Sequence, residues 1–230
     1  MTESGAARVL VRVWLPDRPG ALGQVASRIG AVRGDIVGID VLERSGDIAV
    51  DEFAVDLADA TLVAVLVREI EEVDGASVEE VKVVDHFPDP RLDALGSAEV
   101  LCRAGSDDEL REVLVAHVRE EFLADWAALM GPDSCLAGDG PDLPGDATLV
   151  ALVAGTTASP AVVNGQTGPE DLAIAALGGH GATLVLGRDG IPFRQRERQQ
   201  LLTLARIADR VWRLLDDRAS LDQTRFRVSP

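Results

Sequence analysis

The spacing of apolar residues changes repeatedly between residues 9 and 84, and this order constrains the fold more than any other feature of the chain. Alternation with a period of two predicts strands, whereas spacing by three and four predicts helices. The expected strands are Val9–Leu15, 35–43, Ile48–Leu57 and Ser77–Val84, and the expected helices are 20–33 and 62–73. The predicted order is strand, helix, strand, strand, helix, strand.

Such an order is that of the split βαβ, or ferredoxin-like, α+β fold. The first strand is partly apolar on both sides, because Leu10 and Trp14 alternate with its main apolar residues. If helices cover one face of the sheet, these two side chains still need cover on the other face. A partner on that face is therefore expected.

The turn Asp17-Arg18-Pro19-Gly20 joins the first strand to the first helix, which begins at Gly20 or Ala21. A ligand carboxylate can approach the free N–H groups of Gly20, Ala21 and Leu22, where the helix dipole favours negative charge. Asp17 and Asp35 add two carboxylates that are expected near this mouth and suit an ammonium group. Together these groups describe a site for an amino acid. The alternative is purely structural, with Asp17 as a helix cap and Gly34-Asp35 as a helix stop.

The segment DRPGALGQVASRIGAVRGDIVGIDV resembles the start of an ACT domain, a regulatory module that senses amino acids. The resemblance covers residues 7–86 and implies a ligand site bordered by the Pro-Gly-x-Leu turn and the Gly-Asp-Ile step. It also implies a homodimer in which the turn of one chain faces the second strand of its neighbour. Serine-binding members carry Asn where this chain has Asp17 and Asp35, so the amino acid is not identified. The predicted ligand-binding residues are Asp17, Arg18, Pro19, Gly20, Ala21, Leu22, Asp35 and Ile36.

The formal charge of −17 argues against nucleic acid or an anionic membrane as the main partner, since both require a concentrated basic face. The one basic stretch of note, Arg188 to Arg198, is interpreted as a solvated helix face. Two cysteines, a polar start with no signal peptide and no apolar run of about 20 residues predict a cytoplasmic protein with free thiols and no membrane span.

A Pro-rich linker is expected at residues 87–91, after the first domain at residues 1–86. The segment around it, DHFPDPR, contains Asp85, His86 and Asp89. A metal site from these three residues is conceivable, but a solvated hinge is the favoured interpretation, because no ligand-spaced pair lies on a helix nearby. No cofactor is predicted.

A second domain is expected over residues 92–217, followed by a tail at 218–230. Ser106 and Glu109 form a capping box before a helix whose apolar stripe ends near Phe122. A hairpin follows, and three more strands and a long helix complete the domain. The expected later elements are strands Thr148–Ala154, Leu172–Leu177 and Ala182–Leu186, an irregular stretch 155–170, and a helix 195–217.

Residues 182–215, with Phe193 in the turn, are similar to the last strand and C-terminal helix of a GAF domain. The resemblance implies an antiparallel sheet with flanking helices. The cyclic-nucleotide signature of that family needs a lysine, and Lys82 is the only lysine in the chain. No chromophore-binding cysteine is identifiable either.

The favoured function is a non-catalytic regulator that binds an amino acid and relays this to the GAF-like domain. The alternative is a protein-interaction or dimerisation module without a small-molecule ligand, for which the long helix provides the surface. An enzyme is disfavoured, because no nucleophile elbow, phosphate loop or metal-ligand set is recognisable. An unidentified protein partner for the second domain remains open.

Overall fold

The computed structural model describes residues 5–228, with the backbone alone at residues 90–91 and 222–228. The chain divides into two compact units, residues 1–89 and residues 90–230, each described here by itself. Both are mixed α and β, and each contains one four-stranded antiparallel sheet.

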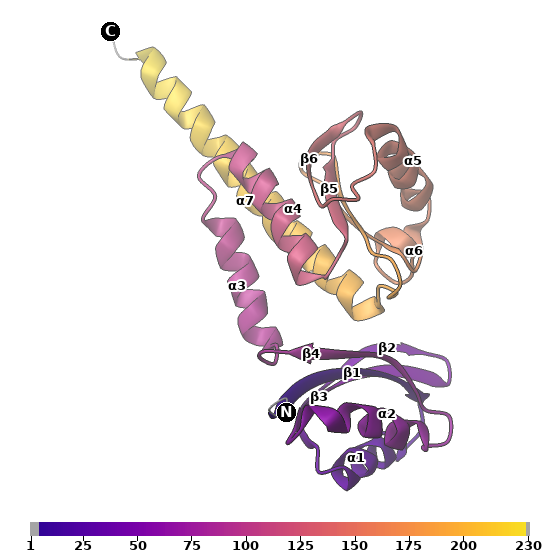
Figure 1. Cartoon of the computed structure of the whole chain (residues 1–230). Helices are drawn as coiled ribbons and strands as arrows, with labels where there is room; N and C mark the ends of the chain where they lie inside the picture. Colours follow the sequence, from indigo (N-terminus) through magenta and orange to yellow (C-terminus); the bar gives the residue numbers. More distant parts are fainter. Residues whose placement is uncertain (1–4, 229–230) are drawn as a thin grey trace. The chain divides into compact units, whose positions relative to one another are not determined.

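Unit 1 has the predicted order of strands and helices (Figure 1). The run of alternating valines in β1 and the Ser77–Val84 strand were both expected from period two. The elements are β1 (Ala7–Pro16), α1 (Ala21–Ala31), β2 (Asp35–Ser45), β3 (Ile48–Leu57), a short 3₁₀ helix η1 (Ala60–Leu62), α2 (Val63–Glu71) and β4 (Ser77–Val84). Unit 1 is therefore a ferredoxin-like element.

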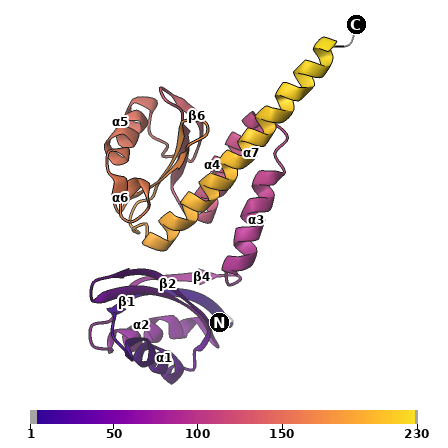
Figure 2. The same ribbon diagram turned by 180° about the vertical axis from the view of Figure 1, so that it is seen from behind.

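In the strand order β2-β3-β1-β4, the first and last strands of unit 1, β1 and β4, lie side by side. Both helices cover one face of this sheet (Figure 2). Alternate residues of β1 and β3 point to that face and form one apolar core with α1 and α2. Its buried members include Val9, Val11, Val13, Val25, Ile29, Phe53, Val55, Leu66 and Ile70.

The helix-free face of the unit 1 sheet carries a polar network across three strands. Arg12 of β1 makes an ion pair with Glu52 of β3 at 3.1 Å, and Trp14 Nε1 donates to Glu79 Oε1 of β4 at 3.0 Å. Leu10 belongs to the same face by alternation. The sequence predicted a partner for this face, and that remains a prediction.

Unit 2 begins with two helices and then forms its sheet in two hairpins. The elements are α3 (Pro90–Cys102), α4 (Asp107–Glu121), β5 (Trp126–Met130), β6 (Cys135–Asp139), α5 (Asp146–Thr157), α6 (Pro160–Val163), β7 (Leu172–Leu177), β8 (Ala182–Gly187) and α7 (Gln195–Val228). The predicted capping box is present, because Ser106 Oγ accepts from the N–H of Glu109 and Glu109 Oε2 accepts from the N–H of Gly105.

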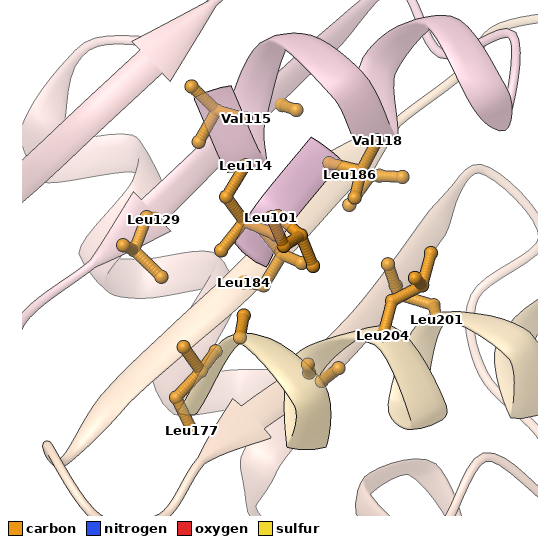
Figure 3. Close-up of a cluster of buried hydrophobic side chains, with 14 of the residues drawn as sticks. Leu101, Leu114, Val115, Val118, Leu129, Leu177, Leu184, Leu186, Leu201 and Leu204 are labelled. Atoms are coloured by element: carbon orange, nitrogen blue, oxygen red, sulfur yellow. The ribbon is translucent and has the colours of Figure 1, made fainter. Parts of the chain in front are cut away.

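The sheet of unit 2, in the order β6-β5-β8-β7, is buried on both faces. One face packs on α3, α4 and α7, where the cluster of leucines and valines in Figure 3 lies. The opposite face packs on α5 and α6 through a smaller cluster that contains Trp126, Met130, Leu149, Ile174 and Val185. Unit 2 is therefore a three-layer arrangement of helix, sheet and helix.

Three predictions of secondary structure in unit 2 are wrong. Residues 155–170 were expected to be irregular, but they contain the end of α5 and the short helix α6. Residues 148–154 were expected as a strand but lie in α5, which buries Leu149 and half-buries Leu152 and Val153. A short apolar run fits a strand and a buried helix equally well, so periodicity alone could not decide. Residues 218–228, expected as a tail, continue α7 to Val228. Residues 229–230 lie outside the described part.

The predicted solvated face at Arg188 to Arg198 is also wrong. The guanidinium of Arg188 is buried, pairs with Glu197 at 3.0 Å and donates to the carbonyl of Phe122. Arg198 is buried as well and donates to the carbonyls of Leu172 and Pro169. These arginines fasten the start of α7 to the loops around the sheet.

Candidate functional site

The turn between β1 and α1 is held by a few backbone hydrogen bonds. The N–H of Asp17 donates to the carbonyl of Asp47 at 2.8 Å, which ties the turn to the β2–β3 hairpin. Gly20 is the N-cap of α1 and has φ of +91°, a left-handed conformation that glycine adopts without the strain of a Cβ. The sequence therefore folds locally as predicted, with the helix beginning at Ala21.

The start of α1 presents free backbone donors. Among the hydrogen bonds of the described residues, the N–H groups of Gly20, Leu22 and Gly23 have no acceptor. The N–H of Ala21, which the sequence predicted as free, donates to the carbonyl of Arg18 at 3.2 Å. Three donors at the positive end of a helix dipole favour an anion such as a carboxylate.

The charged side chains of the turn are exposed and weakly paired. Asp17 lies 3.5 Å from Arg44 of β2, and Arg18 lies 3.9 Å from Asp74. Surface ion pairs of this kind contribute about 0–1 kcal/mol each, so they are easily exchanged for a ligand. Leu22 is 39% exposed beside them, whereas Ala21 is buried in the core.

Asp51 of β3 is a carboxylate on the apolar side of the sheet. It pairs in register with Val13 of β1, which belongs to the core under the helices, so Asp51 faces the same side. Its exposed fraction is 4%, and its Oδ1 has no hydrogen-bond partner. Burial raises the pKa of Asp51, Arg44 opposes this, and the Asp17 carboxylate adds to it. Asp51 thus shares an electrostatic environment with the turn.

Asp51 lies towards the same end of the sheet as the first turn of α1. At the far end of the helix, Ile29 and Val55 both approach Gly34 so closely that a Cβ there would lie 2.9 Å from each. From Ile29 back to Ala21 is about 12 Å of helix, and from Val55 back to Asp51 is about 13 Å of strand. Both paths run towards the β1–α1 turn, where the charge of Asp17 acts on Asp51.

The structure does not bring Asp35 to Asp17. Asp35 begins β2 and is level with Asp56 and Arg8, at the opposite end of the sheet from the turn. The eight residue-to-residue steps of β1 from Arg8 to Pro16 span about 27 Å at about 3.4 Å per residue. Asp35 is exposed there, and Ile36 packs against the unit 1 core. Within one chain, the two predicted halves of the site are therefore separate.

Asp51 and Arg44 were missed as site residues from sequence. The available signal was an acidic residue in the alternation of Asp51, Phe53, Val55 and Leu57, where the other three are core residues. A carboxylate in an apolar position either has a partner or marks a site.

Unit 2 has its own polar cluster, between the β7–β8 hairpin and α7. His180 Nδ1 lies 3.0 Å from Asp209, and its Nε2 lies 3.0 Å from Asp216. The ring stacks on Trp212 at 4.1 Å between centroids. Asp209 also accepts from the N–H of Gly179 and from Arg213. Burial alone would raise the pKa of Asp209, but these hydrogen bonds outweigh it and lower the pKa. Both ring nitrogens of His180 and the carboxylate of Asp209 have partners within the fold, which is typical of a structural cluster.

A serine and a histidine meet between α3 and α4. His117 Nε2 lies 2.8 Å from Ser97 Oγ, and that hydroxyl donates to the carbonyl of Asp93 at 2.9 Å. Ser97 is 1% exposed. A nucleophile must reach its substrate, so this pair is a link between helices rather than a catalytic dyad.

Between residues 5 and 228, no group of three or more His, Cys, Asp or Glu side chains is placed to hold a metal ion. Within the same range, no helix combines the length and apolarity required to cross a bilayer. Cys102 and Cys135 are free thiols.

No protein-family model matches the chain, and no curated protein matches it. Among solved structures, the chain is similar to the ACT domain of a GTP pyrophosphokinase from Chlorobium tepidum, with 16% identity and a TM-score of 0.28 over 36% of this chain and 90% of that one. It is also similar to an unknown protein from Galdieria sulphuraria, with 13% identity and a TM-score of 0.32 over 89% of this chain and 93% of that one. Similarities this weak carry no argument, so the ferredoxin-like fold of unit 1 rests on its own topology.

Proposed function

We propose that the protein is a non-catalytic regulator whose ACT-like unit 1 binds a free amino acid at the start of α1. Unit 2, which resembles a GAF domain in sequence, relays the binding event. The observation that carries the proposal is the arrangement of charged and polar groups at the junction of β1 and α1. Free N–H donors at the start of α1 follow Asp17 in the chain, and the charge of Asp17 acts on the buried carboxylate of Asp51. Donors for a carboxylate next to acceptors for an ammonium group match the two ends of an amino acid.

Glycine and the short turn make this junction accessible. Gly20 has no side chain, and a Cβ added to it would meet no atom within 4 Å, so the space beside Gly20 is open. Leu22 is exposed at the same place and offers an apolar contact for a ligand side chain. The chemistry therefore favours a neutral amino acid over aspartate or glutamate, because Asp17 and Asp51 repel a second carboxylate.

Asp35 enters this proposal only through a second copy of the chain. It lies about 27 Å from the turn of its own chain, so it contributes only if β2 of a neighbour packs against that turn. The proposal is therefore a homodimer with Asp35 and Ile36 of one copy beside Asp17, Arg18 and Pro19 of the other. Ligand binding then stabilises the dimer by linkage.

The test is thermal unfolding of the full chain at pH 7 with each of the twenty amino acids at millimolar concentration. A ligand at 100 times its Kd adds about 2.7 kcal/mol of stability, which raises Tm by several degrees. We expect neutral amino acids to give the largest shift and glutamate the smallest. A larger shift with glutamate than with any neutral amino acid would contradict the placement of the ligand.

Two variants distinguish a ligand site shared between two chains from a site within one chain. Asp35→Ala is expected to weaken dimers in sedimentation velocity and to reduce the shift in Tm, because ligand binding and dimer formation are linked. Glu71→Gln removes a carboxylate from an exposed position of α2 and is expected to change neither result. A shift of wild-type size in Asp35→Ala would place the whole site within one chain.

The second candidate function is an interaction module without a small ligand. It is favoured by α7, whose Leu214 and Leu221 are 53% and 67% exposed and lie seven residues apart (Figure 1). Residues spaced by seven share one side of a helix and are typical of helix pairing. Dimers that persist while all twenty amino acids leave Tm unchanged would favour this candidate.

A further inference from the structure

The unpaired carboxylate of Asp51 is the feature of unit 1 that its fold does not explain. In the described residues, buried side-chain oxygens and nitrogens are generally paired, but Asp51 Oδ1 has no partner and Asp51 is 96% buried, with an exposed fraction of 4%. A buried, unpaired carboxylate costs stability. A hydrogen-bonding cation is the group that would satisfy it.

Asp51 lies between two strands, one of which is at the edge of the sheet. β1 lies on one side of it and the edge strand β2 on the other, where Val41 is its register partner. Val41 and Ile39 alternate onto the same face of β2 and are 42% and 40% exposed. In the described part of the chain, no strand lies beyond β2 in this sheet. The side of Asp51 that leads to exposed apolar side chains is therefore the one past Val41 and Ile39.

The first turn of α1 lies towards the same end of the sheet as Asp51. It follows Asp17, whose charge acts on Asp51, and it contains the free N–H groups of Leu22 and Gly23. Arg44 pairs with the exposed Asp17 at 3.5 Å, whereas no hydrogen bond joins it to Asp51. Arg44, whose charge lowers the pKa of Asp51, is thus partly engaged by Asp17.

We propose that Asp51 receives the ammonium group of the ligand, while the N–H groups of Leu22 and Gly23 receive its carboxylate and the aliphatic face of Ile39 and Val41 contacts its side chain. This inference rests on the proposed function and identifies its amine subsite. It predicts a neutral, aliphatic amino acid, and it places the amine contact within one chain.

The test uses the full chain at pH 7 and three probes: the twenty amino acids, n-butylamine and sodium butyrate. Affinity is measured by isothermal titration calorimetry for the wild type, Asp51→Asn and the control Glu71→Gln. The expected result is an amino acid that binds the wild type and Glu71→Gln equally, and that binds Asp51→Asn at least ten-fold more weakly. A charge-assisted hydrogen bond accounts for a loss of this size.

The outcomes separate this inference from the function on which it rests. An amino acid that binds the wild type and Asp51→Asn equally overturns the inference and leaves the function in place. Binding of n-butylamine that requires Asp51, without binding of any amino acid, supports the amine subsite and overturns the amino-acid function. No binding of any probe to the wild type overturns both. Asp51→Ser, which is smaller and neutral, repeats the comparison if Asp51→Asn is not folded by circular dichroism.

Discussion

At the scale of single residues, the buried carboxylate of Asp51 is expected to lower the free energy of unfolding of the protein. Its folded pKa is raised above the ordinary value of 3.8, so folding favours the protonated form. The cost is absent below the unfolded pKa and develops as pH rises through the folded pKa. Asp51→Asn is therefore expected to raise the free energy of unfolding by about 1 kcal/mol at pH 7, because an unpaired buried charge is removed.

The measurement is urea unfolding of the wild type and Asp51→Asn between pH 7 and pH 3.5. The gain should shrink as pH falls towards and below 3.8, because the Asp51 carboxyl then becomes protonated in the unfolded state as well as in the folded state. Glu71→Gln, on the surface of α2, should change stability little at any pH. A loss of stability in Asp51→Asn at pH 7 would show that the carboxylate has a stabilising partner.

At the scale of elements, the cluster around His180 joins the β7–β8 hairpin to α7. The carboxylate of Asp209 is hydrogen-bonded to the N–H of Gly179, to His180 and to Arg213, and these contacts lower the pKa of Asp209 in the folded state. Its contribution is present above the unfolded pKa and is lost as pH falls through the folded pKa. Asp209→Asn is expected to cost about 2 kcal/mol at pH 7, because hydrogen bonds to a charged group are weakened.

The matched control for this prediction is Asp216→Asn, which removes the other carboxylate beside His180. The Asp216 side chain is 53% exposed, so its loss should cost under about 0.5 kcal/mol. Denaturant unfolding at pH 7 measures the free energy of unfolding of both variants. The same measurement below pH 3.8 should give a smaller difference between their losses of stability. Equal losses in both variants would contradict the central role of Asp209.

The elements of unit 1 could be predicted from sequence because their apolar residues keep a strict period. The strand Ser77–Val84 has the same bounds in prediction and structure. In unit 2, α5 was missed because the run from Leu149 to Val153 is short and apolar throughout. The end of α7 was missed because the apolar stripe fades after Asp217, although Arg, Ala and Leu still favour a helix.

The site was only partly predictable for a geometric reason. The turn and the donors at the start of α1 are local, so neighbouring residues determine them. Asp35 is near Asp17 only in sequence, because α1 carries the chain back along the sheet before β2 begins. Asp51 is near only in space, and placing it requires the register of β3 against β1. Pattern reading does not provide that register.

At the scale of the whole molecule, the two units have separate cores. Every residue of the unit 1 cluster belongs to residues 1–89, and every residue of the two unit 2 clusters belongs to residues 90–230. Domains of about 90 residues bury enough surface to fold alone. Fragments 1–89 and 90–230 are therefore each expected to unfold cooperatively on heating, as measured by circular dichroism.

Because the two units have separate cores, the isolated fragments can show which unit binds the ligand. If the amino acid binds at the β1–α1 turn, it stabilises fragment 1–89 as it stabilises the full chain and leaves the Tm of fragment 90–230 unchanged. A ligand shift confined to fragment 90–230 would move the sensor to unit 2. A fragment 1–89 with no cooperative transition would show that unit 1 requires unit 2 to fold, and communication between the units would then begin with folding itself.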